Sequence, residues 1–204
     1  MKNTLFIFGV LGLFVFATTP PSSSTDQETS IFIVDTLKST VEWKAMIHTG
    51  NVNFLEGELE YDERLTAMNL VLDMKNLVNT DVENELLKGT LENVLKSPDF
   101  FNIEKFPKAY FELHESTKKE DNYIFTADFT LFDNWSVCTD FEGQVELKGD
   151  SIYITTERIP FDRTDWGIYY LSKNNPFPKE EEDNMEVPDT IFVKAHIVAY
   201  RKEK

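Results

Sequence analysis

Apolar and polar residues alternate with a period of two in one segment of this chain after another. In residues 125–131, for example, Phe125, Ala127 and Phe129 alternate with polar residues. A strand with this pattern has one face against a core and one face in water. Antiparallel strands of this kind close into a barrel or pair into a sandwich, so the sequence predicts an all-β fold. The pattern recurs at 41–45, 55–61, 70–74, 141–147 and 191–199, and it places Leu55 and Leu147 on inward faces.

Two segments depart from this alternation. Within residues 82–96, Leu87, Leu91 and Leu95 recur at helical spacing, which predicts one helical insertion with Asp81 as its cap. The second segment, 174–188, contains several prolines and an acidic run at 180–183. We expect an exposed acidic loop there, because prolines interrupt strands and four adjacent carboxylates favour water.

The N-terminal residues have the layout of a secretory signal peptide. Lys2 precedes an apolar run of 13 residues that ends at Ala17, a small residue suited to cleavage. A membrane anchor is the alternative, but 13 residues are too few to span a bilayer. We therefore expect a signal peptide at 1–17, a flexible leader at 18–30 and one domain at 31–201. The sequence has no lipid-anchor cysteine near the cleavage position, so the expected location is the periplasm or the medium.

The charge of the chain limits its partners. With 36 acidic and 20 basic residues the net charge is −16, and loss of Lys2 with the signal peptide makes it −17. A surface of this sign repels phosphate, so we expect no nucleic acid partner and no stable membrane insertion.

Phenylalanine is unusually frequent, with 17 residues beside 7 Tyr and 3 Trp, and these rings need an apolar environment.

Few residues suggest catalysis or metal binding. Cys138 is the single cysteine, and its neighbours Val137 and Thr139 offer it no basic partner, so we expect a small buried residue and not a nucleophile. The three histidines are far apart in the sequence, and no nucleophile and base stand at a recognisable spacing. The expectation is a protein that is not an enzyme and has neither a metal nor a cofactor, apart from a bound lipid or quinone.

Several segments, in the right order, resemble the YceI family of exported bacterial lipid-binding proteins. The closest is 95–111, whose Leu-Lys-Ser-Pro-Asp-Phe-Phe-Asn start is similar to the family's Leu-basic-Ser-x-Asp-Phe-Phe-Asp stretch. Segments 34–43 and 48–59 are similar to the family's first two strands. The Arg-Thr-Asp-Trp-Gly run at 163–167 matches its Arg-x-Asp-aromatic-Gly segment. The likeness covers about 31–200.

The resemblance implies an antiparallel, lipocalin-like β-barrel of about eight strands with one helix near its mouth. Its interior would hold a long apolar chain, either a polyisoprenoid or an isoprenoid quinone. Arg163 and Asp165 are expected to form a local ion pair or to support the turn, and not to contact a ligand head group. The inward and mouth positions that become candidate ligand contacts are Trp43, Leu59, Leu72, Phe100, Phe101, Phe106, Phe111, Phe129, Phe141, Val145, Trp166, Tyr169 and Ile197.

Two classes of function follow from the sequence. The first is a non-enzymatic protein that carries, stores or sequesters an isoprenoid-type lipid. The alternative is a structural or interaction module with a solid barrel core, whose acidic surface engages a protein partner. A homodimer is compatible with both. They differ in whether the barrel is hollow, because inward aromatic side chains fill a core as readily as they line a tunnel.

Overall fold

A computed structural model describes residues 29–133, 135–176 and 186–203. The predicted signal peptide at 1–17 lies outside these residues. So do most of the predicted leader at 18–30 and the acidic run within the predicted loop at 174–188.

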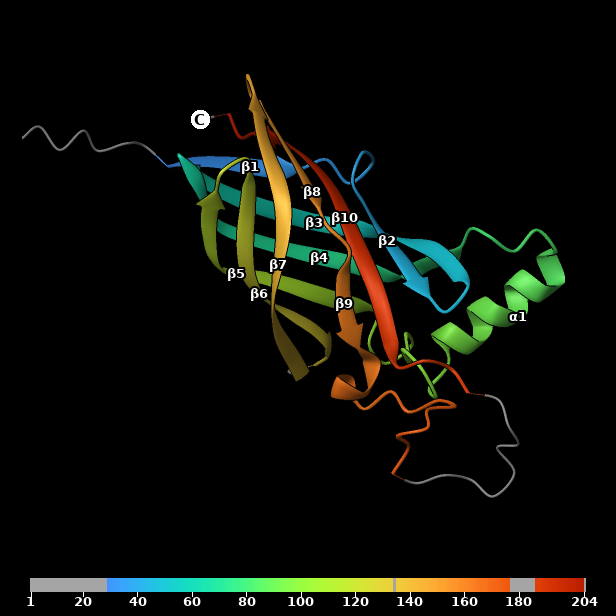
Figure 1. Cartoon of the computed structure of the whole chain (residues 1–204). Coiled ribbons are helices and arrows are strands. Elements are labelled where there is room, and N and C mark those ends of the chain that lie inside the picture. Colours follow the sequence, from blue (N-terminus) through green and yellow to red (C-terminus); the bar gives the residue numbers. More distant parts are fainter. Residues whose placement is uncertain (1–28, 134, 177–185, 204) are drawn as a thin grey trace, which may run out of the picture.

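Strands dominate the described part of the chain (Figure 1). The elements in chain order are β1 (Ser30–Val34), β2 (Thr40–Ala45), β3 (His48–Asp62), β4 (Arg64–Asn79), α1 (Glu85–Lys96), β5 (Lys108–Lys119), β6 (Asn122–Phe132), β7 (Trp135–Lys148), β8 (Ser151–Thr156), β9 (Ile159–Asp162), the 3₁₀ helix η1 (Arg163–Trp166) and β10 (Thr190–Arg201).

The strands form a closed ring. Eight of them follow one another by antiparallel pairing in the order β10-β2-β3-β4-β5-β6-β7-β8, and β8 pairs back onto β10. Each of the two short strands continues the line of a longer strand of this ring. β1 lies in line with β2, pairing with β3 and β10, and β9 lies in line with β8, pairing with β10. The predicted antiparallel, lipocalin-like barrel of about eight strands is confirmed.

One end of the barrel is densely packed. The hairpins that join β3 to β4, β5 to β6 and β7 to β8 lie at this end (Figure 1). Phe32, Leu59, Phe125 and Ile152 are completely buried there, and Leu65 beside the first hairpin is 1% exposed. We call this region the packed end, since its side chains fill the interior as a hydrophobic core does.

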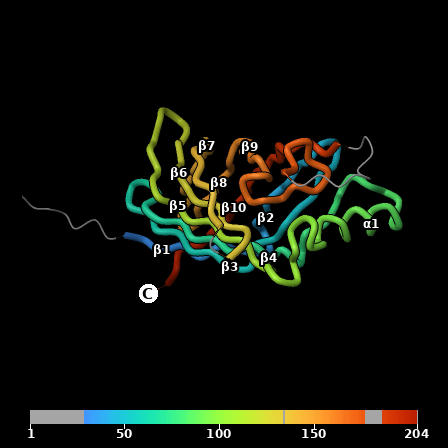
Figure 2. The backbone as a smooth tube through the Cα atoms, turned by 90° about the horizontal axis from the view of Figure 1, so that it is seen from below, coloured from blue at the N-terminus to red at the C-terminus, as the bar shows by residue number. Residues whose placement is uncertain are grey.

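Helix α1 lies at the other end of the barrel (Figures 1 and 2). Asn84 caps it, with its side chain accepting hydrogen bonds from the backbone N–H groups of Leu86 and Leu87. The prediction that Asp81 is the cap was wrong. Asp81 instead accepts a 2.8 Å hydrogen bond from the Thr49 backbone N–H, which lowers the pKa of its carboxyl below the ordinary value. No helix among the described residues has the length and hydropathy needed to cross a membrane.

Two apolar residues predicted to point inward are exposed. Leu55 is 46% exposed because β3 has a bulge between Phe54 and Glu56, which shifts the alternation by one residue and buries Phe54. Leu147 is 43% exposed beside the turn into β8, at the rim of the barrel.

Candidate ligand cavity

The end of the barrel that carries α1 is hollow. It contains a cavity of about 120 Å³, counted as the space that the centre of a water molecule can occupy. Side chains from most strands of the ring, from α1 and from the segment after it line this space. An engineered protein cavity of about 150 Å³ stays dry and binds benzene. The cavity therefore suits one ring or a short length of hydrocarbon.

The lining of the cavity is almost entirely apolar. Apart from the indole N–H groups of its tryptophans, the described lining carries polar side-chain groups at three residues, Lys44, Tyr110 and Thr156. The Thr156 hydroxyl oxygen already accepts a 2.9 Å hydrogen bond from the backbone N–H of Ala195. A ligand in this space would be held by apolar contact with few polar partners.

Aromatic rings form one wall of the cavity. Phe129 of β6 lies at their centre, with its ring 5.0 Å from that of Phe111 and 4.6 Å from that of Phe161, both edge to face. Phe141 of β7 is 6.0 Å away, and Phe161 continues to Trp166 at 5.3 Å. Rings in such arrangements attract one another beyond the area that they bury.

Trp43 lines the opposite side of the cavity, and its indole can lie there only because the residue beneath it is a glycine. Its indole packs over Gly50 of β3, where an added Cβ would lie 2.4 Å from Cζ2 of the ring and 2.0 Å from the carbonyl oxygen of Val78. Its Nε1–H is buried without a hydrogen-bond partner among the described residues. An unpaired buried donor is costly, so this N–H is a polar group that the fold itself leaves unsatisfied.

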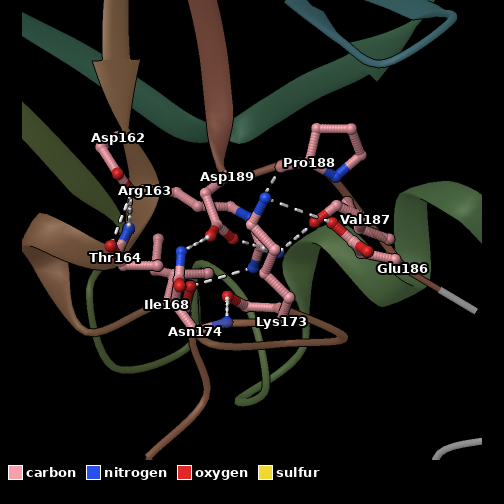
Figure 3. A network of polar contacts seen from close by, with 11 residues as sticks. Asp162, Arg163, Thr164, Ile168, Lys173, Asn174, Glu186, Val187, Pro188 and Asp189 are labelled. Atoms are coloured by element: carbon pink, nitrogen blue, oxygen red, sulfur yellow. Dashed lines mark hydrogen bonds and ion pairs between the residues drawn. The ribbon is translucent and has the colours of Figure 1, made fainter.

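Next to the cavity, the side chain of one buried arginine connects two segments of the chain (Figure 3). Arg163 is completely buried, forms a 3.1 Å ion pair with Asp189, and donates hydrogen bonds of 2.9 Å and 2.8 Å to the carbonyl oxygens of Ile168 and Val187. Burial lowers the pKa of its guanidinium, and Asp189 opposes that shift. Of the two roles expected for Arg163 and Asp165, Arg163 supports the local chain through Ile168, but its ion pair is with Asp189 and not with the exposed Asp165.

Arg163 also connects this network to the cavity. Its guanidinium lies over the ring of Phe100, 5.6 Å from the centroid, and Phe100 is a lining residue. Trp166, at the end of η1, lines the cavity as well and donates a 3.3 Å hydrogen bond to the carbonyl oxygen of Phe129. The arginine thus anchors the segments 163–168 and 187–189 across this end of the barrel.

Most of the candidate ligand contacts from the sequence lie around this one cavity. They are Trp43, Leu72, Phe100, Phe101, Phe111, Phe129, Phe141, Trp166 and Ile197. Four others are not among the lining residues. Leu59 belongs to the packed end, where it pairs with Phe32. Phe106 packs on Phe132 at 5.0 Å and lines a groove on the outside of the barrel. Val145 and Tyr169 are half-buried away from the cavity.

Sequence reasoning missed several lining residues. Leu70, Met74, Ile191 and Val193 lie on alternating faces that were identified, so the same signal could have found them. Other lining residues could not be identified from alternation. The bulge in β3 puts Phe54 out of phase with the rest of its strand, and β9 is too short for Ile159 and Phe161 to form a recognisable pattern.

Cys138 lies on the outside of the barrel, and the expectation of a buried residue was wrong. It occupies an outward position of β7 opposite Asp128 of β6. Desolvation and the carboxylates of Asp128 and Asp140 raise the pKa of its thiol. A thiol kept protonated in this way is not an activated nucleophile.

Fold and cavity together define the class, which is a closed antiparallel β-barrel with a packed end and an apolar hollow end. The chain belongs to the YceI family, since the family model described as a YceI-like domain matches residues 32–199.

Individual relatives are distant. A UPF0312 protein of Photorhabdus laumondii is 30% identical over 82 residues, which are 40% of this chain and 41% of that protein. Among solved structures, BcnA of Burkholderia cenocepacia is 17% identical with a TM-score of 0.62, covering 81% of this chain and 98% of the other. A polyisoprenoid-binding domain of Saccharophagus degradans is 11% identical with a TM-score of 0.57, covering 86% of this chain and 100% of the other. At these identities the solved structures show the shared fold.

Proposed function

We propose that this protein is an exported, non-enzymatic carrier that holds the tail of a long apolar isoprenoid, either a polyisoprenoid or an isoprenoid quinone, inside its barrel. The observation that carries the proposal is the apolar cavity at the hollow end. The solved Saccharophagus domain, which shares the fold, is described as polyisoprenoid-binding, and this supports the same ligand class here.

Burial of the tail would supply the binding energy. Apolar surface contributes about 25 cal/mol per Å², so roughly 400 Å² of buried tail gives about 10 kcal/mol before ordering costs. A chain of several isoprene units exceeds a cavity of about 120 Å³. Its access therefore requires the lining side chains to rotate, and the Phe129 cluster is the part of the wall with the most ring surface to move.

Export is part of the proposal. It is supported by the charged start, the apolar run and the small residue at position 17. A mature protein in the periplasm or the medium would begin at Thr18, which N-terminal sequencing can read directly.

The contrast between the two ends of the barrel favours a carrier over a solid interaction module. The packed end shows how this sequence fills a barrel, with Leu59 and Phe125 completely buried against their neighbours. The hollow end is not filled in this way, although it contains more rings. A core selected only for rigidity would have no reason to leave the space open.

Replacing Phe129 with tryptophan is expected to remove most of the lipid-binding capacity and leave the fold intact. The larger ring would occupy the cavity, so its overpacking cost should stay below the usual ~1–3 kcal/mol. Binding can be measured by incubating the protein with an isoprenoid quinone in detergent micelles and determining the quinone that co-elutes in gel filtration.

The matched control is Phe125→Leu, on the same strand but in the packed end. It should lower stability by about 1 kcal/mol and keep the quinone stoichiometry of the wild type. Equal quinone binding by Phe129→Trp and the wild type would contradict the assignment of the cavity.

A further inference from the structure

Three side chains that can bind metal converge on the outside of the barrel. They are His114 of β5, Asp128 of β6 and Cys138 of β7, and their ligating atoms all lie within 4.8 Å of one another. His114 Nε2 is 3.2 Å from Asp128 Oδ2, and Asp128 and Cys138 are direct cross-strand partners. The group lies on the opposite side of the sheet from the cavity, since the next residue after Asp128 is the lining residue Phe129.

A bulge brings the histidine into this group. The pairing of β5 with β6 shifts between Leu113 and Glu115, so His114 is the extra residue of β5. Bulges of this kind redirect one side chain without breaking the sheet. Leu113 remains buried on the inner face while His114 is 44% exposed on the outer face and reaches across to Asp128. All three ligands are therefore held on paired strands.

The donor set selects a class of metal. Thiolate sulfur and imidazole nitrogen favour zinc and its first-row neighbours, whereas calcium and magnesium require oxygen ligands. Bond lengths of about 2.0–2.3 Å place neighbouring ligands of a tetrahedral Zn²⁺ roughly 3.3–3.7 Å apart. The His114–Asp128 separation of 3.2 Å is close to this value, and rotation of exposed side chains can close the remaining gap.

We propose that His114, Asp128 and Cys138 bind one divalent transition-metal ion of the zinc class, with a solvent molecule in the fourth position. The ion would reach the site from solvent, because the histidine and aspartate side chains are 44% and 30% exposed. Glu112, the cross-strand partner of Asp128 on β5, adds negative charge on the same face. This site is independent of lipid binding.

Two other histidines in the chain serve as internal comparisons. His48 lies 3.0 Å from Asp81, and His196 lies 3.6 Å from Glu42. Within the described ranges, neither pair has a third ligating side chain that would complete a metal site. His48 is exposed to a similar degree as His114, so it makes a matched control.

The test is titration of the reduced, chelator-treated protein with Co²⁺ and then Zn²⁺. We expect one equivalent of Co²⁺ to produce a thiolate-to-cobalt charge-transfer absorption that Zn²⁺ abolishes. His114→Gln and Cys138→Ser should each weaken Zn²⁺ binding at least ~10-fold, and His48→Gln should leave it unchanged. In the unmodified protein, Zn²⁺ should also protect the Cys138 thiol from iodoacetamide, a readout that does not depend on how the variants fold.

Three results would each overturn the proposal. The first is the absence of the charge-transfer absorption from the wild type at one equivalent of Co²⁺. The second is undiminished Zn²⁺ binding by His114→Gln. The third is an equal loss of Zn²⁺ affinity in His48→Gln.

Discussion

Replacing Arg163 with methionine is expected to destabilise the protein by about 3–5 kcal/mol, as found when one partner of a buried ion pair is removed. Methionine fills a similar volume but leaves the Asp189 carboxylate buried without its cation. It also leaves the carbonyl oxygens of Ile168 and Val187 without their donor. The segments that these bonds hold across the hollow end should loosen first, because their backbone groups then regain partners only by contact with water.

Chemical denaturation of the wild type and the variant measures this effect. Arg201→Met is the matched control, since Arg201 pairs with Asp150, whose side chain is 87% exposed. Exposed pairs of this kind contribute at most about 1 kcal/mol. Arg163→Lys should recover little of the lost stability, because one ammonium group cannot satisfy the carbonyls that the planar guanidinium reaches. Equal losses from Arg163→Met and Arg201→Met would contradict the role assigned to Arg163.

Gly50→Ala is expected to cost about 3 kcal/mol or more, at or above the upper part of the usual range for overpacking. The added Cβ would lie 2.0 Å from the carbonyl oxygen of Val78, a backbone atom that moves only if β3 and β4 separate. It would also displace the indole of Trp43 from the cavity wall. Quinone binding and stability should therefore decline together in this variant.

Gly89→Ala is the control for that substitution. Gly89 lies within α1, where an added Cβ meets nothing within 4 Å. Alanine in a helix interior is favoured over glycine, so this variant should gain about 0.5–1 kcal/mol. If Gly50→Ala and Gly89→Ala shifted the denaturation midpoint in the same direction, the close contact at Gly50 would not be the cause of the stability change.

Local pattern was enough to predict an all-β fold with one helical insertion, and the resemblance to the YceI family added the closed barrel. Phe129 and Ile197 lie on faces marked by simple alternation, and the strands that carry them pair as a barrel requires. Alternation shows which face of a strand a residue lies on, but it does not show where along the barrel axis that residue lies. Leu59 and Leu72 give the same local signal, yet Leu59 is in the packed end and Leu72 lines the cavity. Hairpin registers decide that difference, and they depend on contacts between distant segments.

The errors about polar residues have the same origin. The sequence near Arg163 offers Asp165 as a partner, but its actual partner is Asp189, which the start of β10 brings beside it. Cys138 has no chemically useful neighbour in sequence, whereas strand pairing places Asp128 opposite it. The bulge that adds His114 to this group leaves no mark in the sequence. Such clusters are products of register and could not have been predicted from spacing.

Mass spectrometry of organic extracts tests most directly whether the hollow end holds an isoprenoid lipid. The full chain would be produced in a bacterial host that makes isoprenoid quinones and polyprenyl phosphates, then purified without detergent. We predict close to one isoprenoid molecule per protein, and a much lower amount from Phe129→Trp purified in parallel. A wild-type protein that carries no lipid, and that also fails to take up quinone from micelles, would contradict the account.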